Sequence, residues 1–158
     1  MKAKAITNFA QQFGVQIALN PDLLVEKSGR YFLVNSAQRP YVRQDFFYAG
    51  VYLGKAREGK FFPSFNLLGL LAKENSSRVI VDGRTAWLFI CGRDIFGRGV
   101  VKVQGSAKNN MNILVFNEFS ECLGFGRIVG NLTETSNFEQ IVVRNVLDLG
   151  DFLRRERY

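Results

Sequence analysis

Arginines set among glycines are the strongest chemical signal in this sequence. The stretches ICGRDIFGRGVV (90–101) and LGFGRIVGN (123–131) place Arg93, Arg98 and Arg127 in or beside glycine turns. Exposed backbone N–H groups at such turns can bind a phosphate together with a guanidinium group. Two alternatives stay open: the arginines can be solvated surface residues, and the glycines can serve the corners of a small β module.

Neither stretch fits a nucleotide-binding loop. LGFGRIVG is one residue longer than the dinucleotide fingerprint and is followed by NLTETSNF, so it lacks the apolar helix whose N-terminus would hold a pyrophosphate. GRDIFGRG lacks the G-K-[ST] ending of a phosphate loop. Cys91 and Cys122 have no metal-ligand spacing, and we interpret them as buried free thiols. We therefore expect no cofactor and no metal.

The composition favours a binding protein over an enzyme. The chain has no histidine, which removes the commonest general base and the usual mixed zinc sites. Its net charge of +7 and pI near 9.7 favour a polyanionic partner, RNA first. No apolar run is long enough for a membrane helix, and the N-terminal residues do not resemble a signal peptide. We expect no membrane association and a cytoplasmic location, or a nuclear or nucleolar one in a eukaryote.

The first half predicts a mixture of helices and short strands. Residues 2–13 have helical spacing and end at Gly14, while VQIALN and RYFLVN are strand candidates around a possible helical turn at 20–22. FFYAGVYLGKAREGKFFPS predicts two strands joined by a turn over 55–60, with Gly50 and Gly54 as bends or bulges. Ser64 can cap a helix over FNLLGLLAKENSS.

The polar stretch KENSS (73–77) marks the predicted domain boundary. It separates a helix from the β-like run RVIVDG, so we expect domains over 1–76 and 77–158. The first half has a net charge of +5 and the second half +2, counted from the printed sequence.

The second half predicts a small β barrel with short helices. Asp82 can cap a helix that carries Trp87 toward a core, and a hairpin loop is expected over 117–121 between two of the runs GVVKVQG, NMNILVFNEF and ECLGFGRIVG. QIVVRNV is a further strand. Asp148 can cap a last helix with Leu149, Phe152 and Leu153 directed inward.

The second half resembles a PUA domain, an RNA-binding pseudo-barrel. The similarity rests on VIVDGRTAWLFICGRDIFGRGVV, ILVFNEFSECLGFGRI and DLGDFLRRE. More narrowly, the sequence resembles the Nip-seven family of ribosome-assembly factors and their archaeal relatives. YAGVYLGKAREGKFFPSFNLLGLLA in the first half is consistent with that family. The resemblance implies an α+β protein, with an N-terminal α/β domain followed by a C-terminal PUA-like β pseudo-barrel with short helices, and no catalytic activity of its own.

The resemblance also locates the expected RNA contacts, with one departure. Many relatives are basic after LGFGR, whereas this chain has IVGNLTETSNFEQ with Glu134 and Glu139. Phosphate contacts are then expected from Arg93, Arg98, Lys102, Arg127 and Arg144, and secondarily from Arg39, Arg43, Lys55, Arg57 and Lys60. Tyr41 or Phe96 could stack on bases, with core packing as the commoner alternative.

The C-terminal cations Arg154, Arg155 and Arg157 are assigned to the helix end through its dipole, with RNA contact as the alternative.

The function expected from these features is non-catalytic RNA binding in ribosome biogenesis, including rRNA processing or large-subunit assembly. The expected partners are ribosomal or pre-ribosomal RNA and ribosome-assembly or RNA-processing proteins. Two alternatives remain: an RNA-binding accessory subunit of an RNA-modification enzyme, and a protein-interaction adaptor with a PUA fold.

Overall fold

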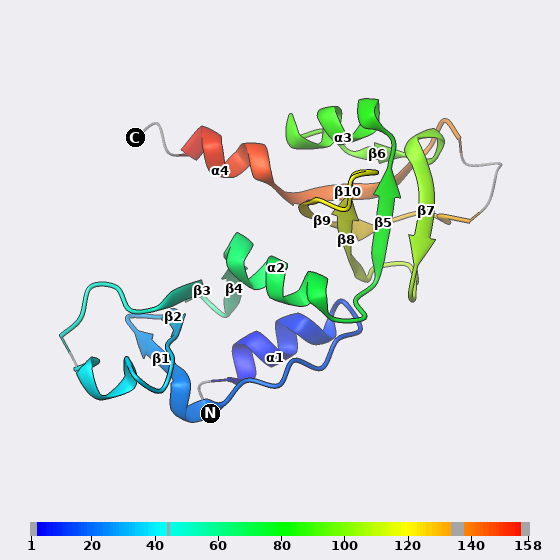
Figure 1. The fold of residues 1–158 in the computed structure, drawn as a ribbon. Helices are drawn as coiled ribbons and strands as arrows, with labels where there is room; N and C mark the ends of the chain where they lie inside the picture. Colours follow the sequence, from blue (N-terminus) through cyan, green and yellow to red (C-terminus); the bar gives the residue numbers. More distant parts are fainter. Residues whose placement is uncertain (1–2, 44, 134–137, 156–158) are drawn as a thin grey trace. The chain divides into compact units, whose positions relative to one another are not determined.

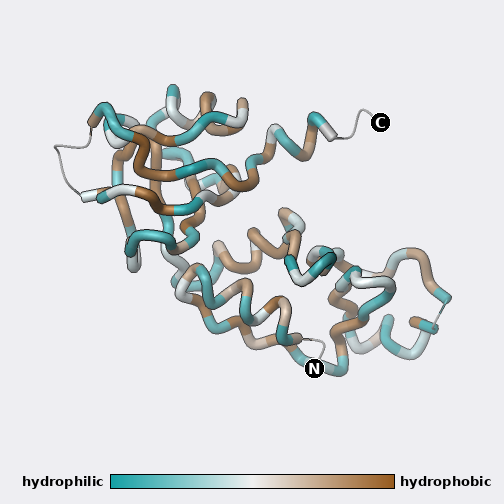
Figure 2. The backbone as a smooth tube through the Cα atoms, turned by 180° about the vertical axis from the view of Figure 1, so that it is seen from behind, coloured by the Kyte–Doolittle hydropathy of each residue, from teal (hydrophilic) through white to brown (hydrophobic). Residues whose placement is uncertain are grey.

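The protein is described by a computed structural model over residues 3–43, 45–133 and 138–155 (Figure 1). Its chain forms two compact units, a first unit of Met1–Gln11 with Val15–Glu74 and a second unit of Gln12–Gly14 with Asn75–Tyr158. None of the described helices is long and apolar enough to cross a membrane. Figure 2 shows hydrophobic and hydrophilic residues alternating along much of the chain, as expected of half-buried strands and helices.

The first unit is an antiparallel meander covered by two helices. Its sheet has the order β1-β2-β3-β4, and the two helices lie side by side in Figures 1 and 2. The elements are α1 (Lys4–Gln11), η1 (Pro21–Leu23), β1 (Leu24–Lys27), β2 (Arg30–Leu33), η2 (Arg39–Tyr41), β3 (Val51–Arg57), β4 (Lys60–Pro63) and α2 (Phe65–Lys73).

Several local predictions for the first unit are confirmed. α1 ends at Gln11, and the turn that follows it closes at Gly14 with a φ of +73°. The Ser64 hydroxyl accepts a hydrogen bond from the Leu67 N–H at 3.2 Å. The register between β2 and β3 shifts by one residue beside Gly54, whose φ is +147°. Gly54 is therefore a β-bulge, which a side chain at that position would oppose.

The strand expected over VQIALN is wrong. Residues 15–20 have alternating burial but form no ladder with any described strand, so the alternation reflects one-sided burial of an extended segment. The strand β1 instead follows η1, where the Asn20 side chain accepts a hydrogen bond from the Asp22 N–H at 3.0 Å. The short strand was hidden because its residues, LVEK, do not alternate strictly.

The second unit is a curled six-stranded sheet with the order β6-β10-β9-β8-β5-β7 (Figure 1). β5 and β8 run parallel and the other neighbours are antiparallel. The elements are β5 (Arg78–Val81), α3 (Gly83–Ile90), β6 (Ile95–Phe96), η3 (Gly97–Gly99), β7 (Val100–Gln104), β8 (Asn112–Phe116), β9 (Cys122–Ile128), β10 (Ile141–Asp148) and α4 (Leu149–Arg155). The expected β pseudo-barrel with short helices is confirmed, and its sheet is curled into a half-barrel.

The core of the second unit lies on one face of this sheet, beneath α3. It includes Val79, Ile113, Ile128 and Val143 from four strands and Phe89 from the helix, all fully buried. Burying these apolar side chains is the main source of stability for the unit.

Both capping predictions for the second unit are confirmed, and the burial predicted for the helices is wrong. Asp82 Oδ1 accepts from the Thr85 N–H and Asp148 Oδ1 from the Asp151 N–H, each at 2.7 Å. Trp87 is 64% exposed because α3 buries Ala86 and Phe89, and Trp87 lies between them on the outer side.

The last helix also differs from expectation. Its apolar side chains are substantially exposed: Leu149 39%, Phe152 49% and Leu153 60%. A polar contact joins the helix to α3, since Arg154 donates to the Ile90 carbonyl at 3.0 Å.

Candidate nucleic-acid interface

Arg127 and Arg144 form a cross-strand pair on β9 and β10. They are directly opposite each other in the register, and both are exposed. The next pair along the ladder, Ile128 and Val143, is buried in the core, so the arginines point to the outer face. Among the described residues no carboxylate forms a salt bridge with either arginine. Two unneutralised guanidinium groups side by side favour the binding of an anion.

Asn112 extends this pair to a third strand. It lies opposite Arg127 on β8, and its side-chain N–H donates to Gln12 Oε1 at 2.6 Å. Gln12 belongs to the second unit, as does Phe13, whose ring meets that of Phe125 edge-on at 5.3 Å. The segment 12–14 thus covers part of the outer face and leaves the arginine pair exposed beside it.

Arg98 lies elsewhere and has a partner within the chain. Its guanidinium group donates to both oxygens of Glu139, at 3.2 and 3.1 Å, and lies 5.4 Å from the Phe96 ring centroid. Glu139 therefore pairs with one of the predicted RNA-binding arginines, Arg98. Among the described residues it forms no salt bridge with Arg127 or Arg144. Both side chains are exposed, so the ion pair is weak and a phosphate could compete for Arg98. Glu134 lies outside the described residues.

Arg93 is fixed through its backbone on the other side of β10. Its carbonyl accepts from Asn145 Nδ2 at 3.4 Å, and Asp94 Oδ1 accepts from the Asn145 N–H at 2.9 Å. Asn145 follows Arg144 in the strand, so their side chains point to opposite faces. The structure thus places Arg93 near β10 but does not combine it with Arg144 on one face.

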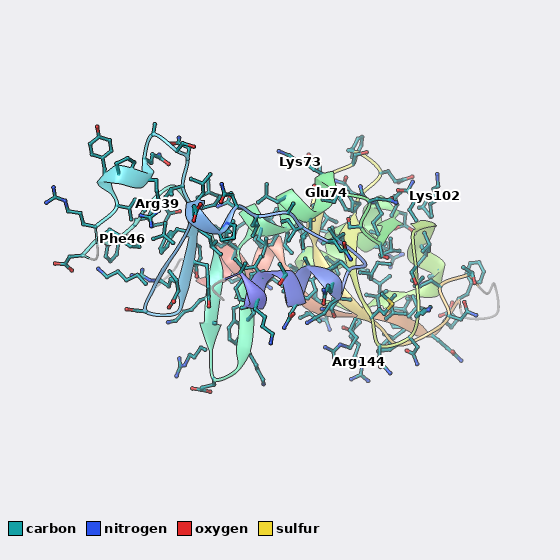
Figure 3. The ribbon with its side chains drawn as sticks, turned by 90° about the horizontal axis from the view of Figure 1, so that it is seen from below. Arg39, Phe46, Lys73, Glu74, Lys102 and Arg144 are labelled. Atoms are coloured by element: carbon teal, nitrogen blue, oxygen red, sulfur yellow. The ribbon has the colours of Figure 1, made fainter. Side chains whose placement is uncertain are left out.

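Lys102 is distant from the arginine pair within the sheet. It lies on β7, opposite Ile80, and three strands separate β7 from β10. Figure 3 shows Lys102 and Arg144 well apart in the second unit. The predicted RNA-binding residues of this unit therefore fall into four places: the Arg127–Arg144 pair, Arg93 beside Asn145, Arg98 beside Glu139, and Lys102 on β7.

The glycines of the two stretches have structural roles. Gly124 lies inside β9, with a φ of +140°, and a Cβ there would come within 2.0 Å of the Leu147 carbonyl oxygen. A Cβ at the buried Gly99 would come within 2.0 Å of the Thr85 hydroxyl. The expectation that Arg127 lies in or beside a glycine turn is wrong, because its neighbours Gly124 and Gly126 are part of a continuous strand. The glycines allow close packing of backbone and helix instead.

In the first unit the structure brings Lys55, Arg57 and Lys60 together on the β3–β4 hairpin, where all three are exposed. Arg39 and Arg43 belong to the segment between β2 and β3, and Arg39 donates to the Asp22 carbonyl at 2.7 Å. Figure 3 labels Arg39 on this segment.

The sequence reasoning missed Lys27 and Arg30. These two lie opposite each other on β1 and β2, and Arg30 lies opposite Lys55 on β3. Lys27 could not be placed from the sequence because β1 was not recognised as a strand.

Tyr41 and Phe96, the two aromatic residues considered for base stacking, are both exposed, so the core-packing alternative is wrong for both. Tyr41 is 84% exposed and Phe96 37%.

The thiols also differ from expectation: Cys91 is exposed and Cys122 is half-buried. Burial raises the pKa of the Cys122 thiol, an effect that its contact with Gly124 and the charge of Arg78 oppose.

Of the three C-terminal cations only Arg154 has a described side chain, and its assignment to the helix end is wrong. Arg154 reaches back to Asp148 at the start of α4, at 3.1 Å, and does not bind the helix C-terminus. The side chain of Arg155 and the whole of Arg157 lie outside the description.

Comparison with known proteins identifies the second unit. The model of the UPF0113 PUA domain family matches residues 77–157, about half of the chain. A UPF0113 protein from Archaeoglobus fulgidus is 35% identical over 114 residues, which cover 70% of this chain and 63% of that protein. This chain therefore spans less than two thirds of that relative's length.

Two solved structures share the fold over nearly the whole chain. A conserved PUA domain protein from Thermoplasma acidophilum matches with a TM-score of 0.61 and 20% identity, over 98% of this chain and 93% of that one. A hypothetical protein from the hyperthermophilic archaeon Pyrococcus horikoshii matches with a TM-score of 0.61 and 18% identity, over 99% and 95%. A PUA domain points to RNA binding. With the family model covering the second unit, this chain belongs to the UPF0113 PUA domain family.

Proposed function

We propose that this protein is a non-catalytic RNA-binding factor that acts in ribosome assembly, in the processing of ribosomal RNA or the assembly of the large subunit. The observation that carries RNA binding is the exposed Arg127–Arg144 pair on the PUA domain, whose guanidinium groups lie opposite each other. Such a pair suits a phosphate backbone, which presents repeated negative charges. The ribosomal role rests on the resemblance to the Nip-seven family. The proposed partners are ribosomal RNA precursors and assembly proteins, and the proposed location is cytoplasmic, or nuclear in a eukaryote.

The absence of catalysis is part of the proposal. The sequence has no histidine, and neither glycine-rich stretch has the form of a nucleotide-binding loop. The protein would act by holding RNA and by contacting other proteins. Exposed apolar residues on α3 and α4, namely Trp87, Leu149, Phe152 and Leu153, support a protein contact in addition to RNA.

RNA binding is tested by the affinity of the full chain for a labelled single-stranded RNA of mixed sequence at moderate salt. Replacing both arginines (Arg127→Ala with Arg144→Ala) removes two charge-assisted contacts, so we expect Kd to rise by about 10-fold or more. The matched control is Arg84→Ala with Lys108→Ala, which removes two exposed cations from the same unit. Equal losses in the two double variants would show a response to net charge alone and would contradict a site at Arg127 and Arg144.

The ribosomal role needs a separate measurement. We expect the tagged protein to sediment with large-subunit precursors and to recover ribosomal RNA after crosslinking in cells. Recovery of an RNA-modification enzyme in place of ribosomal precursors would favour the accessory-subunit alternative.

A further inference from the structure

The first sheet presents a face on which cations and aromatic rings lie in register. Lys27, Arg30, Lys55 and Phe62 are successive neighbours across β1, β2, β3 and β4. Directly opposed residues in antiparallel strands direct their side chains to the same face. Arg57 and Lys60, another opposed pair, continue this face toward the β3–β4 turn. We call it the open face, and it consists of Lys27, Arg30, Phe32, Tyr52, Lys55, Arg57, Lys60 and Phe62.

The helices of the first unit cover the opposite face. Phe61 contacts Phe9 of α1 with ring centroids 5.4 Å apart, and it contacts Tyr31 at 6.0 Å. Successive residues of a strand point to opposite sides, so Phe62 is directed away from α1. Its side chain is 53% exposed, which is high for a phenylalanine in the middle of a short strand.

An aromatic cluster closes one end of the open face. Phe32 is fully buried under three rings of the same unit, with centroids at 5.5 Å for Phe46, 5.1 Å for Tyr48 and 5.5 Å for Tyr52. Phe46, labelled in Figure 3, and Tyr48 come from the segment between β2 and β3. Tyr48 packs on Phe32 and is still 57% exposed, so its ring is held in place by Phe32 and remains accessible to a partner. A ring held in this way loses little conformational entropy when a second ring stacks on it.

The cations of the open face lie next to these rings. Lys27 lies 5.4 Å from the centroid of Phe46, and Arg30 lies 5.3 Å from that of Phe47, which is 81% exposed. Burial raises the pKa of the Tyr52 hydroxyl, although the charge of Arg30 opposes this effect. The hydroxyl therefore stays neutral at physiological pH and adds no negative charge to the face.

The open face is positive overall. Of its cations, Lys27 pairs with Asp45 at 3.4 Å and Arg57 with Glu58 at 3.1 Å, and in both pairs the carboxylate is highly exposed. Within residues 3–43, 45–133 and 138–155 no salt bridge involves Arg30, Lys55 or Lys60. Their charge is available to a polyanion, and the exposed rings are available to a planar partner.

We propose that the open face of the first sheet binds single-stranded RNA, with bases stacked on Phe62 and Tyr48 and phosphates held by Arg30, Lys55 and Lys60. This proposal rests on the proposed function in that the chain binds RNA, but it assigns a second site, in the other unit. Exposed rings beside cations suit single-stranded RNA, because stacking tolerates any base and the cations follow the backbone. An acidic protein would use the cations Arg30, Lys55 and Lys60 but not the exposed rings beside them.

The test compares RNA with the same RNA made abasic at every position, using the full chain. The wild type should bind the normal RNA more tightly, because an abasic strand keeps its phosphates and loses its stacking. The variant Phe62→Leu with Tyr48→Leu should lose about 5- to 100-fold in affinity for normal RNA and should change little for the abasic strand. Phe119→Leu is the matched control, since Phe119 is 84% exposed in the β8–β9 loop, outside the open face.

Tyr48 packs on the buried Phe32, so the double variant can lose stability as well as RNA contacts. If the double variant unfolds, the single variant Phe62→Leu, at an exposed position, is measured in its place. Photo-crosslinking followed by peptide mapping gives a second readout, with adducts expected on peptides containing residues 47–48 and 62. Normal affinity of Phe62→Leu, or crosslinks confined to the second unit, would overturn the proposal and leave the PUA site intact. If the wild type binds no RNA, both the proposed function and this inference fail. Loss of affinity in the open-face variants alone, with Arg127→Ala/Arg144→Ala unaffected, would support this site and contradict the first.

Discussion

Arg127 and Arg144 lie opposite each other on neighbouring strands, an arrangement that is unfavourable for two cations in the free protein. Like charges in direct opposition repel, and the described residues offer no carboxylate to neutralise them. Arg98 is the opposite case, since Glu139 neutralises it across a loop. The difference between Arg98 and Arg127 is invisible in the sequence, where each follows a glycine, because it depends on which segment lies opposite.

The two cysteines differ in exposure, and this predicts their order of reaction. Cys91 is exposed, whereas Cys122 is half-buried and burial raises its pKa. A raised pKa leaves less thiolate at a given pH, so we expect iodoacetamide to alkylate Cys91 several times faster at pH 8. The difference should narrow as the pH rises and Cys122 ionises. Peptide mass spectrometry follows both sites, and Cys91→Ser should abolish the fast phase. Faster modification of Cys122 would contradict the structure.

At the scale of the element, the last helix depends on polar contacts at its first turn. Asp148 is buried, caps α4 through the Asp151 N–H and accepts from Arg154 at 3.1 Å. Asp148→Ala should lower the free energy of unfolding by about 1–2 kcal/mol, the usual cost of losing a helix cap. Arg154→Ala should cost less, because half of that side chain is in solvent.

Urea unfolding measures both changes, and Glu118→Ala in the exposed β8–β9 loop is the control for loss of one negative charge. A larger loss for Arg154→Ala than for Asp148→Ala would mean that the ion pair, and not the cap, holds the helix.

Elements with strong local signals could be predicted from the sequence. The caps at Ser64, Asp82 and Asp148 and the hairpin loop over 117–121 were predictable because each depends on residues within a few positions. The exposure of Trp87 and of the apolar α4 side chains was not predictable, because it depends on which helical face meets the sheet. The Arg127–Arg144 pair and the open face were likewise hidden, since both are created by strand register.

At the scale of the whole molecule, the net charge of +7 is carried by local surfaces within each unit. The second unit exposes the arginine pair on a PUA domain, and the first unit exposes the row from Lys27 to Phe62. Two moderate contacts with one flexible strand reinforce each other through effective concentration. A long RNA that reaches both surfaces should therefore bind with a lower Kd than a short RNA that fills only one of them.

The salt dependence of RNA affinity tests the central claim most directly. Binding of a labelled single-stranded RNA is measured across a series of potassium chloride concentrations for the wild type, for Arg127→Ala/Arg144→Ala and for Arg84→Ala/Lys108→Ala. Each phosphate contact contributes about 0.7 to the slope of log affinity against log salt on single strands. We predict that the Arg127/Arg144 variant loses about 1.4 units of slope while the control keeps that of the wild type. An unchanged slope for the Arg127/Arg144 variant would show that this pair does not bind the RNA backbone.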